Sequence, residues 1–298
     1  MDVLNSEKQL RSRTKDLGRF EAPILVCGGA YSNLEALEAL IAAAGKLGIS
    51  ANHIIHTGDV IAYCADPAAT ATLLRESGAH AIQGNVEESL AASLPDCGCG
   101  FNENSLCDKL AAEWFSYADA HTGDELRRWL GSLPNHLTFE MSGLRVRVVH
   151  GSVQEVNRFL FASQPDSDFD AEFALGDSDM IVCGHSGIPF TRQIGTGVWH
   201  NSGSLGLPAN DGTSRAWFSL LTPQENGIRI DHHPLQYDHA LTAKKMIKAG
   251  VCTEYAETLI KGIWPSLDIL PATEKQATGK PLDLSEPFFC AARRVAAE

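Results

Sequence analysis

The chain has 298 residues, of which 44% are apolar and 20% charged, and its formal net charge is -13 at pH 7. This composition is typical of a folded globular protein, and the length predicts one main domain with appendages. No apolar run approaches the roughly 20 residues that cross a bilayer, so a membrane-spanning role is excluded. The acidic balance also opposes nucleic acid as a partner, because non-specific binding depends on cations that neutralise phosphates.

The two ends of the chain differ in character from the middle. Residues 1–20 are polar and charged and lack the apolar stretch of a secretory signal, so they predict a charged N-terminal arm that is partly disordered. Residues 21–238 predict the main domain. Residues 239–298 predict a helical extension packed on that domain, with one or two amphipathic helices and a polar, proline-containing end.

The absence of a secretory signal favours a cytoplasmic location and reduced thiols for the eight cysteines. An oligomer is compatible with these observations.

The first half of the chain alternates strand-like and helix-like segments. An apolar strand over 23–27 precedes a helix, and a second strand around 53–57 precedes a helix that begins at Pro67 and ends at Gly78. A third strand over 80–83 precedes a helical stretch over about 107–133. This alternation predicts a sheet with helices on its faces, in which ligands bind at the carboxyl ends of the strands.

The second half is richer in strands. Segments 136–141 and 144–149 lie close together across a short turn, which predicts a hairpin. Further short strands follow in 180–235, separated by Gly, Asn, Pro and Asp turns. Together these segments predict a second, mostly antiparallel sheet.

Four residues of metal-ligand type follow directly after predicted strands. They are Asp59, Asn85, His150 and His185. A carboxylate, an amide oxygen and two imidazoles at the strand ends of one sheet suit a divalent or trivalent ion such as Mn, Fe or Zn. A lone histidine at a strand end is more often a hydrogen-bonded core residue, but the four together predict a metal site.

The order of these segments resembles the calcineurin-like metallophosphoesterases, whose motifs are DxH, GDxxxY, GNH followed by an acid, HG and GHxH. The matching segments here are GDVIAY at 58–63, GNVE at 84–87, VHG at 149–151 and GHSG at 184–187, and the resemblance runs from about Ile24 to Leu221. It implies an α/β fold, a four-layer αββα sandwich of two mixed sheets flanked by helices. It also implies that Asp59 bridges two metals and that Asn85, His150 and His185 complete the second metal site.

The sequence lacks the other ligand residues of the family's first metal site. Where the resemblance places its ligands the chain has Gly29, Tyr31 and Gly187, and where the family has the histidine of GNH it has Val86. We therefore expect one metal ion per chain. Asp59, Asn85 and Glu87 are the candidate catalytic residues; Glu87 is a candidate proton donor, or else a carboxylate that favours a helix N-terminus.

Four further residues are candidates for the site, each with a plainer alternative. Tyr31 is a candidate ligand through its phenolate or a hydrogen-bond donor through its phenol. His200 lies at a turn that the family places near the rim of the site. Arg158 and Arg192 are candidates for an anion clamp, because a guanidinium binds two phosphate oxygens at once, or else they form surface salt bridges.

Three functional interpretations follow. The first is a metal-dependent hydrolase of a phosphomonoester or phosphodiester, acting on a small phosphorylated molecule or nucleotide. The second is a catalytically weak or inactive relative that keeps one ion and serves as a binding or regulatory protein. The third is redox or thiol chemistry near an iron, through Cys64, Cys97, Cys99 and Cys107. The last three lie in one glycine-rich loop. The alternative interpretation is that the thiols of this loop have no functional role.

Overall fold

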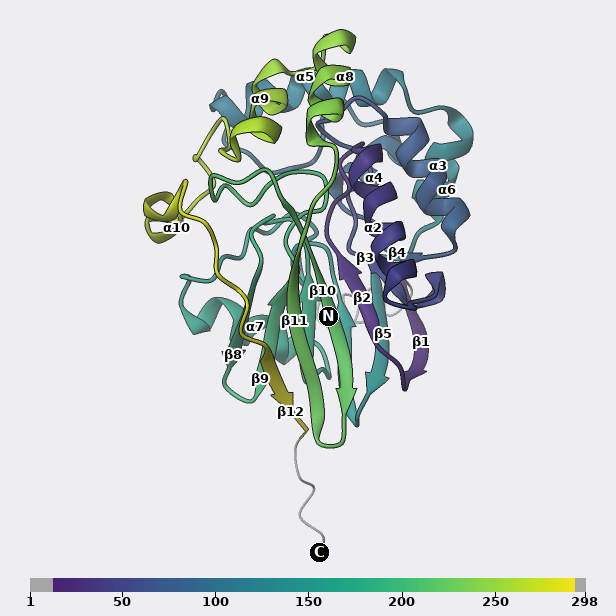
Figure 1. The fold of residues 1–298 in the computed structure, drawn as a ribbon, viewed down its shortest axis with the longest axis vertical. Helices are drawn as coiled ribbons and strands as arrows, with labels where there is room; N and C mark the ends of the chain where they lie inside the picture. Colours follow the sequence, from purple (N-terminus) through teal and green to yellow (C-terminus); the bar gives the residue numbers. More distant parts are fainter. Residues whose placement is uncertain (1–12, 293–298) are drawn as a thin grey trace, which may run out of the picture.

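A computed structural model describes residues 13–292 of the chain (Figure 1). Two six-stranded sheets face each other, and helices cover the outer faces of both. Both sheets contain parallel and antiparallel strand pairs. The predicted fold class, a four-layer α/β sandwich with two mixed sheets, is confirmed.

The first sheet has the strand order β12-β11-β10-β2-β3-β4. Its strands are β2 (Ile24–Cys27), β3 (Ile54–His56), β4 (His80–Ala81), β10 (Ala216–Gln224), β11 (Gly227–Leu235) and β12 (Phe288–Ala291). Strands β2, β3 and β4 run parallel, as the alternation of strands and helices predicts. The hairpin of β10 and β11 joins them antiparallel to β2.

The second sheet has the order β1-β5-β6-β7-β9-β8. Its strands are β1 (Thr14–Phe20), β5 (His136–Met141), β6 (Leu144–Val148), β7 (Met180–Cys183), β8 (Phe190–Ile194) and β9 (Gly197–Asn201). The hairpin of β5 and β6 forms as predicted. The prediction of a mostly antiparallel second sheet is wrong in two respects: β6, β7 and β9 pair in parallel, and β10 and β11 belong to the first sheet.

Helices lie on the two outer faces. The helices are α2 (Leu34–Lys46), α3 (Pro67–Ser77), α4 (Asn85–Ala92), α5 (Leu106–Ala120), α6 (Asp124–Ser132), α7 (Asp166–Leu175), α8 (His239–Ala249), α9 (Thr253–Lys261) and α10 (Ala272–Ala277), with a short 3₁₀ turn at Ala51–His53. Apolar residues of α2, α3, α5, α6, α8 and α9 share one core with the first sheet. Phe169 of α7 packs on the outer face of the second sheet. None of the described helices is long and apolar enough to cross a membrane.

The side chains of strand β2 alternate between the two hydrophobic cores on either side of the first sheet. Successive side chains of a strand point to opposite faces, so Ile24 and Val26 enter the core between the sheets while Leu25 and Cys27 enter the core under the helices. All four are fully buried. A continuous apolar run is therefore what this central strand requires.

Both ends of the chain depart from the prediction. The arm expected over 1–20 is wrong for Thr14–Phe20, which form β1 and pair in parallel with β5; residues 1–12 lie outside the described part. The C-terminal segment forms α8 and α9 as expected, but it then returns to the first sheet as β12, which pairs antiparallel with β11. Figure 1 shows the returning segment along the edge of that sheet.

Candidate metal centre

The loop after β3 places Asp59 beside His150. Gly58 adopts φ +92°, and a Cβ on it would lie 2.7 Å from Nδ1 of His150, so this position needs glycine. Asp59 has φ 59° and is 5% exposed. A left-handed conformation at a residue other than glycine is costly and is concentrated at functional sites. The loop therefore holds the carboxylate at the carboxyl edge of the first sheet.

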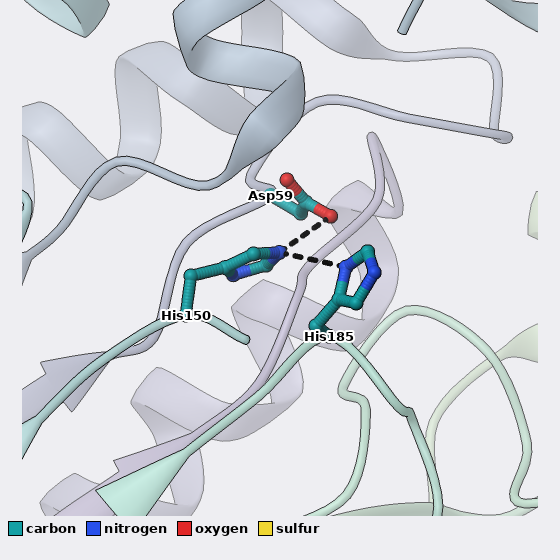
Figure 2. A group of neighbouring side chains, drawn as sticks. All are labelled: Asp59, His150 and His185. Atoms are coloured by element: carbon teal, nitrogen blue, oxygen red, sulfur yellow. Dashed lines mark hydrogen bonds and ion pairs between the residues drawn. The ribbon is translucent and has the colours of Figure 1, made fainter. Parts of the chain in front are cut away.

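Three side chains of metal-ligand type meet where the two sheets end (Figure 2). Nε2 of His150 lies 3.1 Å from Oδ2 of Asp59 and 3.1 Å from Nδ1 of His185. His150 follows β6 and His185 follows β7, so the second sheet supplies both imidazoles. All three side chains are buried, and their ligand atoms lie within 4.8 Å of one another.

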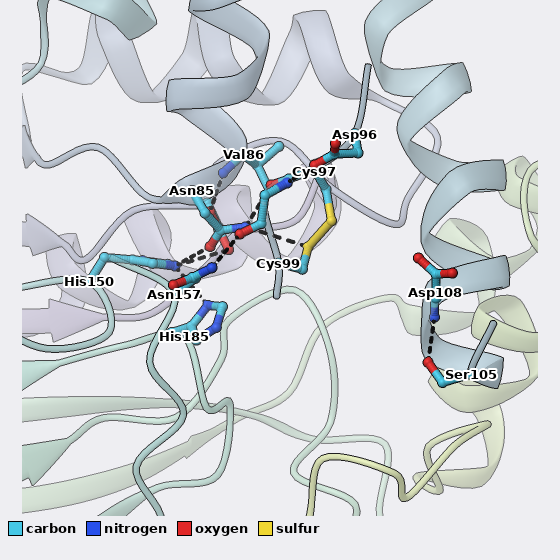
Figure 3. Close-up of a disulfide and its surroundings, with 12 residues drawn as sticks. Asn85, Val86, Asp96, Cys97, Cys99, Ser105, Asp108, His150, Asn157 and His185 are labelled. Atoms are coloured by element: carbon cyan, nitrogen blue, oxygen red, sulfur yellow. Dashed lines mark hydrogen bonds and ion pairs between the residues drawn. A yellow bond between two sulfur atoms is a disulfide. The ribbon is translucent and has the colours of Figure 1, made fainter. Parts of the chain in front are cut away.

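Asn85, the first residue of α4, completes the group. Its Oδ1 lies 3.1 Å from Nε2 of His150, while its Nδ2 donates to the carbonyl of Cys97 at 2.8 Å and contacts Sγ of Cys99 at 3.4 Å (Figure 3). The loop carrying the two cysteines thus turns the amide so that its oxygen faces the histidines. The structure brings together all four residues predicted to bind the metal.

The tautomer of His150 is set by a backbone contact. Nδ1 of His150 donates to the carbonyl of Thr57 at 2.6 Å, which directs Nε2 toward the cluster. Such contacts to the other ring nitrogen are typical of metal-binding histidines. Sequence reasoning missed Thr57 because its role depends on its backbone, which any residue at the end of β3 would offer.

Burial and neighbouring charge perturb the ionisable groups. Burial lowers the pKa of His185 to about 3, and His150 adds to the lowering, so His185 is a neutral imidazole. Burial alone would raise the pKa of Asp59, but His150 outweighs it and holds that pKa below its ordinary value. Burial alone would lower the pKa of His150, but Asp59 in turn outweighs burial and raises that pKa. The carboxylate of Asp59 and the neutral imidazole of His185 are forms that bind metal ions, whereas His150 would release a proton when an ion binds.

These residues fit a metal ion. One imidazole nitrogen makes one hydrogen bond in the plane of its ring, yet Nε2 of His150 faces three ligand-type atoms at 3.1 Å. A cation at this point would satisfy the oxygens of Asp59 and Asn85 and both imidazoles together.

Glu87 stabilises the loops instead of facing the cluster. It is fully buried, and its carboxylate accepts N–H bonds from Asp59 at 2.6 Å, Val60 at 2.9 Å and Gly84 at 2.7 Å. Burial, with the charge of Asp59, raises the pKa of Glu87 to about 7, as a proton donor would need, but both of its oxygens accept backbone N–H bonds. The role of proton donor therefore stays a prediction. The alternative interpretation, a carboxylate at the start of α4, agrees with the contact to Gly84.

Aromatic rings lie beside the two glycines at which the resemblance places ligands of the first metal site. A Cβ on Gly29 would lie 2.3 Å from Cε1 of Tyr31, so the ring of Tyr31 occupies the space beside this glycine. A Cβ on Gly187 would lie 3.3 Å from Cζ2 of Trp264. Val86, at the position of the family's histidine, is 1% exposed and part of the core.

An aromatic pocket opens beside Asp59 and His185. We use this name for the pocket whose aromatic lining consists of Tyr31, Tyr63, Phe101, Phe159, Tyr255 and Trp264. Tyr31 meets Tyr63 edge to face at 4.9 Å between ring centroids, and Phe159 lies 4.2 Å from the ring of His185. Sequence reasoning missed the other five residues, because they come from loops and the C-terminal segment. The tryptophan within segment 262–266 was the available signal.

The other candidates lie elsewhere. His200 is buried between the sheets, where Nδ1 contacts Oγ1 of Thr191 at 2.8 Å and its ring meets His232; it is not part of the metal cluster. Arg158 binds the buried Glu172 at 2.8 Å. Arg192 pairs with Asp166. The pair of Arg192 is the surface salt bridge that was its plainer alternative, whereas Arg158 pairs with a carboxylate that is fully buried. Neither arginine lines the pocket.

The cysteine loop differs from the expectation of reduced thiols. Cys97 and Cys99 form a disulfide (Figure 3), while Cys107 is free and lines the aromatic pocket together with Cys99. Cys64 is buried in the core and does not line the pocket. A cytoplasmic location remains a prediction.

The chain belongs to the calcineurin-like phosphoesterase superfamily. Residues 24–224, more than half of the chain, match the superfamily's domain. Among solved structures, a hypothetical protein from Pyrococcus horikoshii is 18% identical with a TM-score of 0.67, and the match covers 81% of this chain and 99% of that one. A metallophosphoesterase from Sphaerobacter thermophilus is 22% identical with a TM-score of 0.63, covering 82% and 100%. At these identities the likeness supports the fold alone. No curated protein matches the chain.

Proposed function

We propose that this chain is a metal-dependent phosphoesterase that hydrolyses a phosphomonoester or phosphodiester of a small molecule or nucleotide. Asp59, Asn85, His150 and His185 hold a single Mn, Fe or Zn ion. The observation that carries the proposal is the convergence of Asp59 Oδ2, Asn85 Oδ1 and His185 Nδ1 on Nε2 of His150.

A bound ion at this point would supply the positive charge that stabilises a phosphoryl group and would lower the pKa of water. The chain's residues prepare for this in three ways. Thr57 fixes the tautomer of His150, the Cys97 carbonyl orients Asn85, and Glu87 holds the loop that carries Asp59. The site is thus organised before a ligand arrives, which is how enzymes gain most electrostatic stabilisation.

One element of the family's machinery is missing. Val86 cannot donate a proton to a leaving group, and the loss of a general acid typically costs about 10²–10⁴-fold in rate. In this proposal Glu87 does not replace it, because its oxygens accept backbone N–H bonds. We therefore propose slow turnover, or a substrate whose leaving group departs without protonation.

A second candidate function is a binding or regulatory role without turnover. The observation that favours it is the ring of Tyr31, which fills the space beside Gly29 where the family has a first-site ligand. The second site keeps its four residues in either case, so a bound ion is compatible with both functions.

Two measurements separate the hydrolase from the binding role. The first is metal analysis of protein purified without added metal. The second is hydrolysis of p-nitrophenyl phosphate and of bis(p-nitrophenyl) phosphate in the presence of Mn, Fe or Zn. The hydrolase predicts about one ion per chain and turnover that disappears in His150→Ala. One ion per chain without turnover of either ester rejects the hydrolase and supports the binding role.

A further inference from the structure

The aromatic pocket has walls that the metal cluster does not use. Its inner wall contains Tyr31 and Tyr255, which are 5% and 6% exposed. Its outer wall contains Phe101, Phe159 and Trp264, which are half-buried and reach solvent. Half-exposed aromatic rings next to a buried polar site are typical of pockets that bind an apolar group while polar atoms fix its orientation.

Trp264 is held in place by both of its nitrogens. Its indole N–H donates to the carbonyl of Pro208 at 2.7 Å, and its backbone N–H donates to Oδ1 of Asn210 at 2.9 Å. The ring therefore lies against Gly187 in a fixed orientation. A ring that is already ordered loses little conformational entropy when it contacts a ligand.

Phe159 forms the facing side next to the metal cluster. Its ring lies 4.2 Å from that of His185 and stacks with Phe101 at 6.1 Å between centroids. The polar lining groups near it include Asp59 and His185. A ligand whose polar end reaches the cluster would consequently place its other end among these aromatic rings.

The charge of the pocket limits the charge of that ligand. Among the described residues that line it, none is a lysine or an arginine. Arg158 and Arg192 are engaged with acidic partners outside the lining. A divalent ion together with the carboxylate of Asp59 leaves one net positive charge, which matches a phosphodiester with one negative charge better than a phosphomonoester dianion.

From this lining and this charge we infer that the aromatic pocket binds an aryl group of a phosphodiester monoanion, so that aryl phosphodiesters are the preferred substrate class. This inference rests on the proposed function, because it assigns a substrate class to the same site. The rings supply recognition of the aryl group, and the single charge of the diester suits a site without a cationic side chain.

The first arm of the test measures binding without turnover. Diphenylphosphinate and dimethylphosphinate carry the same charge and cannot be hydrolysed at an ester bond, so they differ only in their rings. With Zn-loaded protein we expect diphenylphosphinate to change tryptophan fluorescence with a Kd about tenfold or more lower than dimethylphosphinate. Trp264→Phe should remove most of the signal, whereas Trp129→Phe, outside the pocket, should keep it.

The second arm measures catalysis. We expect kcat/KM to be higher for bis(p-nitrophenyl) phosphate than for p-nitrophenyl phosphate, and Trp264→Ala to raise KM for the diester with a smaller effect on kcat. Trp129→Ala is the matched control. Preference for the monoester, or equal Kd values for the two phosphinates, would overturn the inference.

The two arms separate this inference from the proposed function. Selective binding of diphenylphosphinate without turnover of any ester would retain the aryl pocket and reject the hydrolase. Turnover of esters with no preference for rings or for a single charge would retain the hydrolase and reject the aryl pocket.

Discussion

The ring of Tyr31 occupies the space that a side chain at Gly29 would need, since a Cβ on that glycine would lie 2.3 Å from Cε1 of the tyrosine. The two positions are those at which the superfamily resemblance places two ligands of the first metal. The two residues found at these positions are compatible with each other, because the glycine leaves the space that the ring of the tyrosine fills. An aromatic ring thus lies where the resemblance would place a side chain of the first metal site.

This relationship predicts how metal content responds to restored ligands. Gly29→Asp alone should destabilise the protein, because the carboxylate would clash with the ring of Tyr31. Gly29→Asp combined with Tyr31→His removes the phenol ring and supplies two ligands. The metal content of the purified protein should therefore rise from about one ion per chain toward two. Two ions per chain in the unmodified protein would contradict this account.

Removing a residue of the cluster should abolish tight metal binding. His150→Ala deletes the nitrogen on which Asp59, Asn85 and His185 converge. We expect metal affinity to fall by more than the 10–100-fold that follows loss of a partner of a metal ligand. Isothermal titration with Zn measures the change. His121→Ala, at an exposed histidine, is the matched control and should bind as the unmodified protein does.

The disulfide loop should tune the same affinity. Because the carbonyl of Cys97 orients the amide of Asn85, loosening this loop should weaken metal binding by about tenfold. Cys97→Ser with Cys99→Ser tests this, as does reduction with a phosphine that leaves the metal in solution. The double variant should show no further response to the reductant; a normal response would mean that the reductant acts elsewhere.

The candidate site was largely predictable from sequence because each ligand follows a strand that its own residues define. His150 and His185 come directly after apolar runs that the sequence shows. The parallel pairing of β6 and β7, which places both histidines at the same edge of the second sheet, could not be read from those runs. The hairpin of β5 and β6 was equally local, since Ser142 and Gly143 both adopt positive φ in its turn.

The parts that were missed depend on contacts between distant segments. Ser219 of β10 pairs with Val26 of β2, and no periodicity in either strand names its partner. The aromatic pocket was missed for the same reason, because Phe101, Phe159 and Trp264 lie on three separate loops. Local pattern fixes strands and turns, whereas the choice of neighbours is made by packing over the whole chain.

Glu87 should contribute to stability more than to chemistry. In Glu87→Gln one acceptor oxygen becomes an NH₂ group, which would face a backbone N–H in place of accepting from it. A buried donor left without an acceptor costs about 1–3 kcal/mol, so urea unfolding should show a loss of that size. Glu88→Gln, at the neighbouring half-buried carboxylate, is the control. A variant with full stability but no turnover would instead restore Glu87 as a catalytic residue.

The stability of the fold should decrease in mild acid, in part through His136 at the start of β5. Burial lowers the pKa of His136 to about 4, and Arg147, whose Nη1 lies 3.3 Å from its Nδ1, adds to the lowering. Because an unfolded histidine has a pKa of about 6.5, the unfolded chain takes up this proton first as the pH falls. The contribution of neutral His136 is therefore present above about pH 6.5 and is lost as the pH falls toward 4.

Between pH 7 and pH 5 this one group should reduce the free energy of unfolding by about 2 kcal/mol. Urea unfolding at both pH values, compared between the unmodified protein and His136→Gln, isolates the effect, because the variant keeps every other titrating group. The variant should be less stable at pH 7 but lose less stability on acidification. If both proteins lose the same free energy between the two pH values, His136 is not held neutral by burial and Arg147, and the acid sensitivity of the fold arises elsewhere.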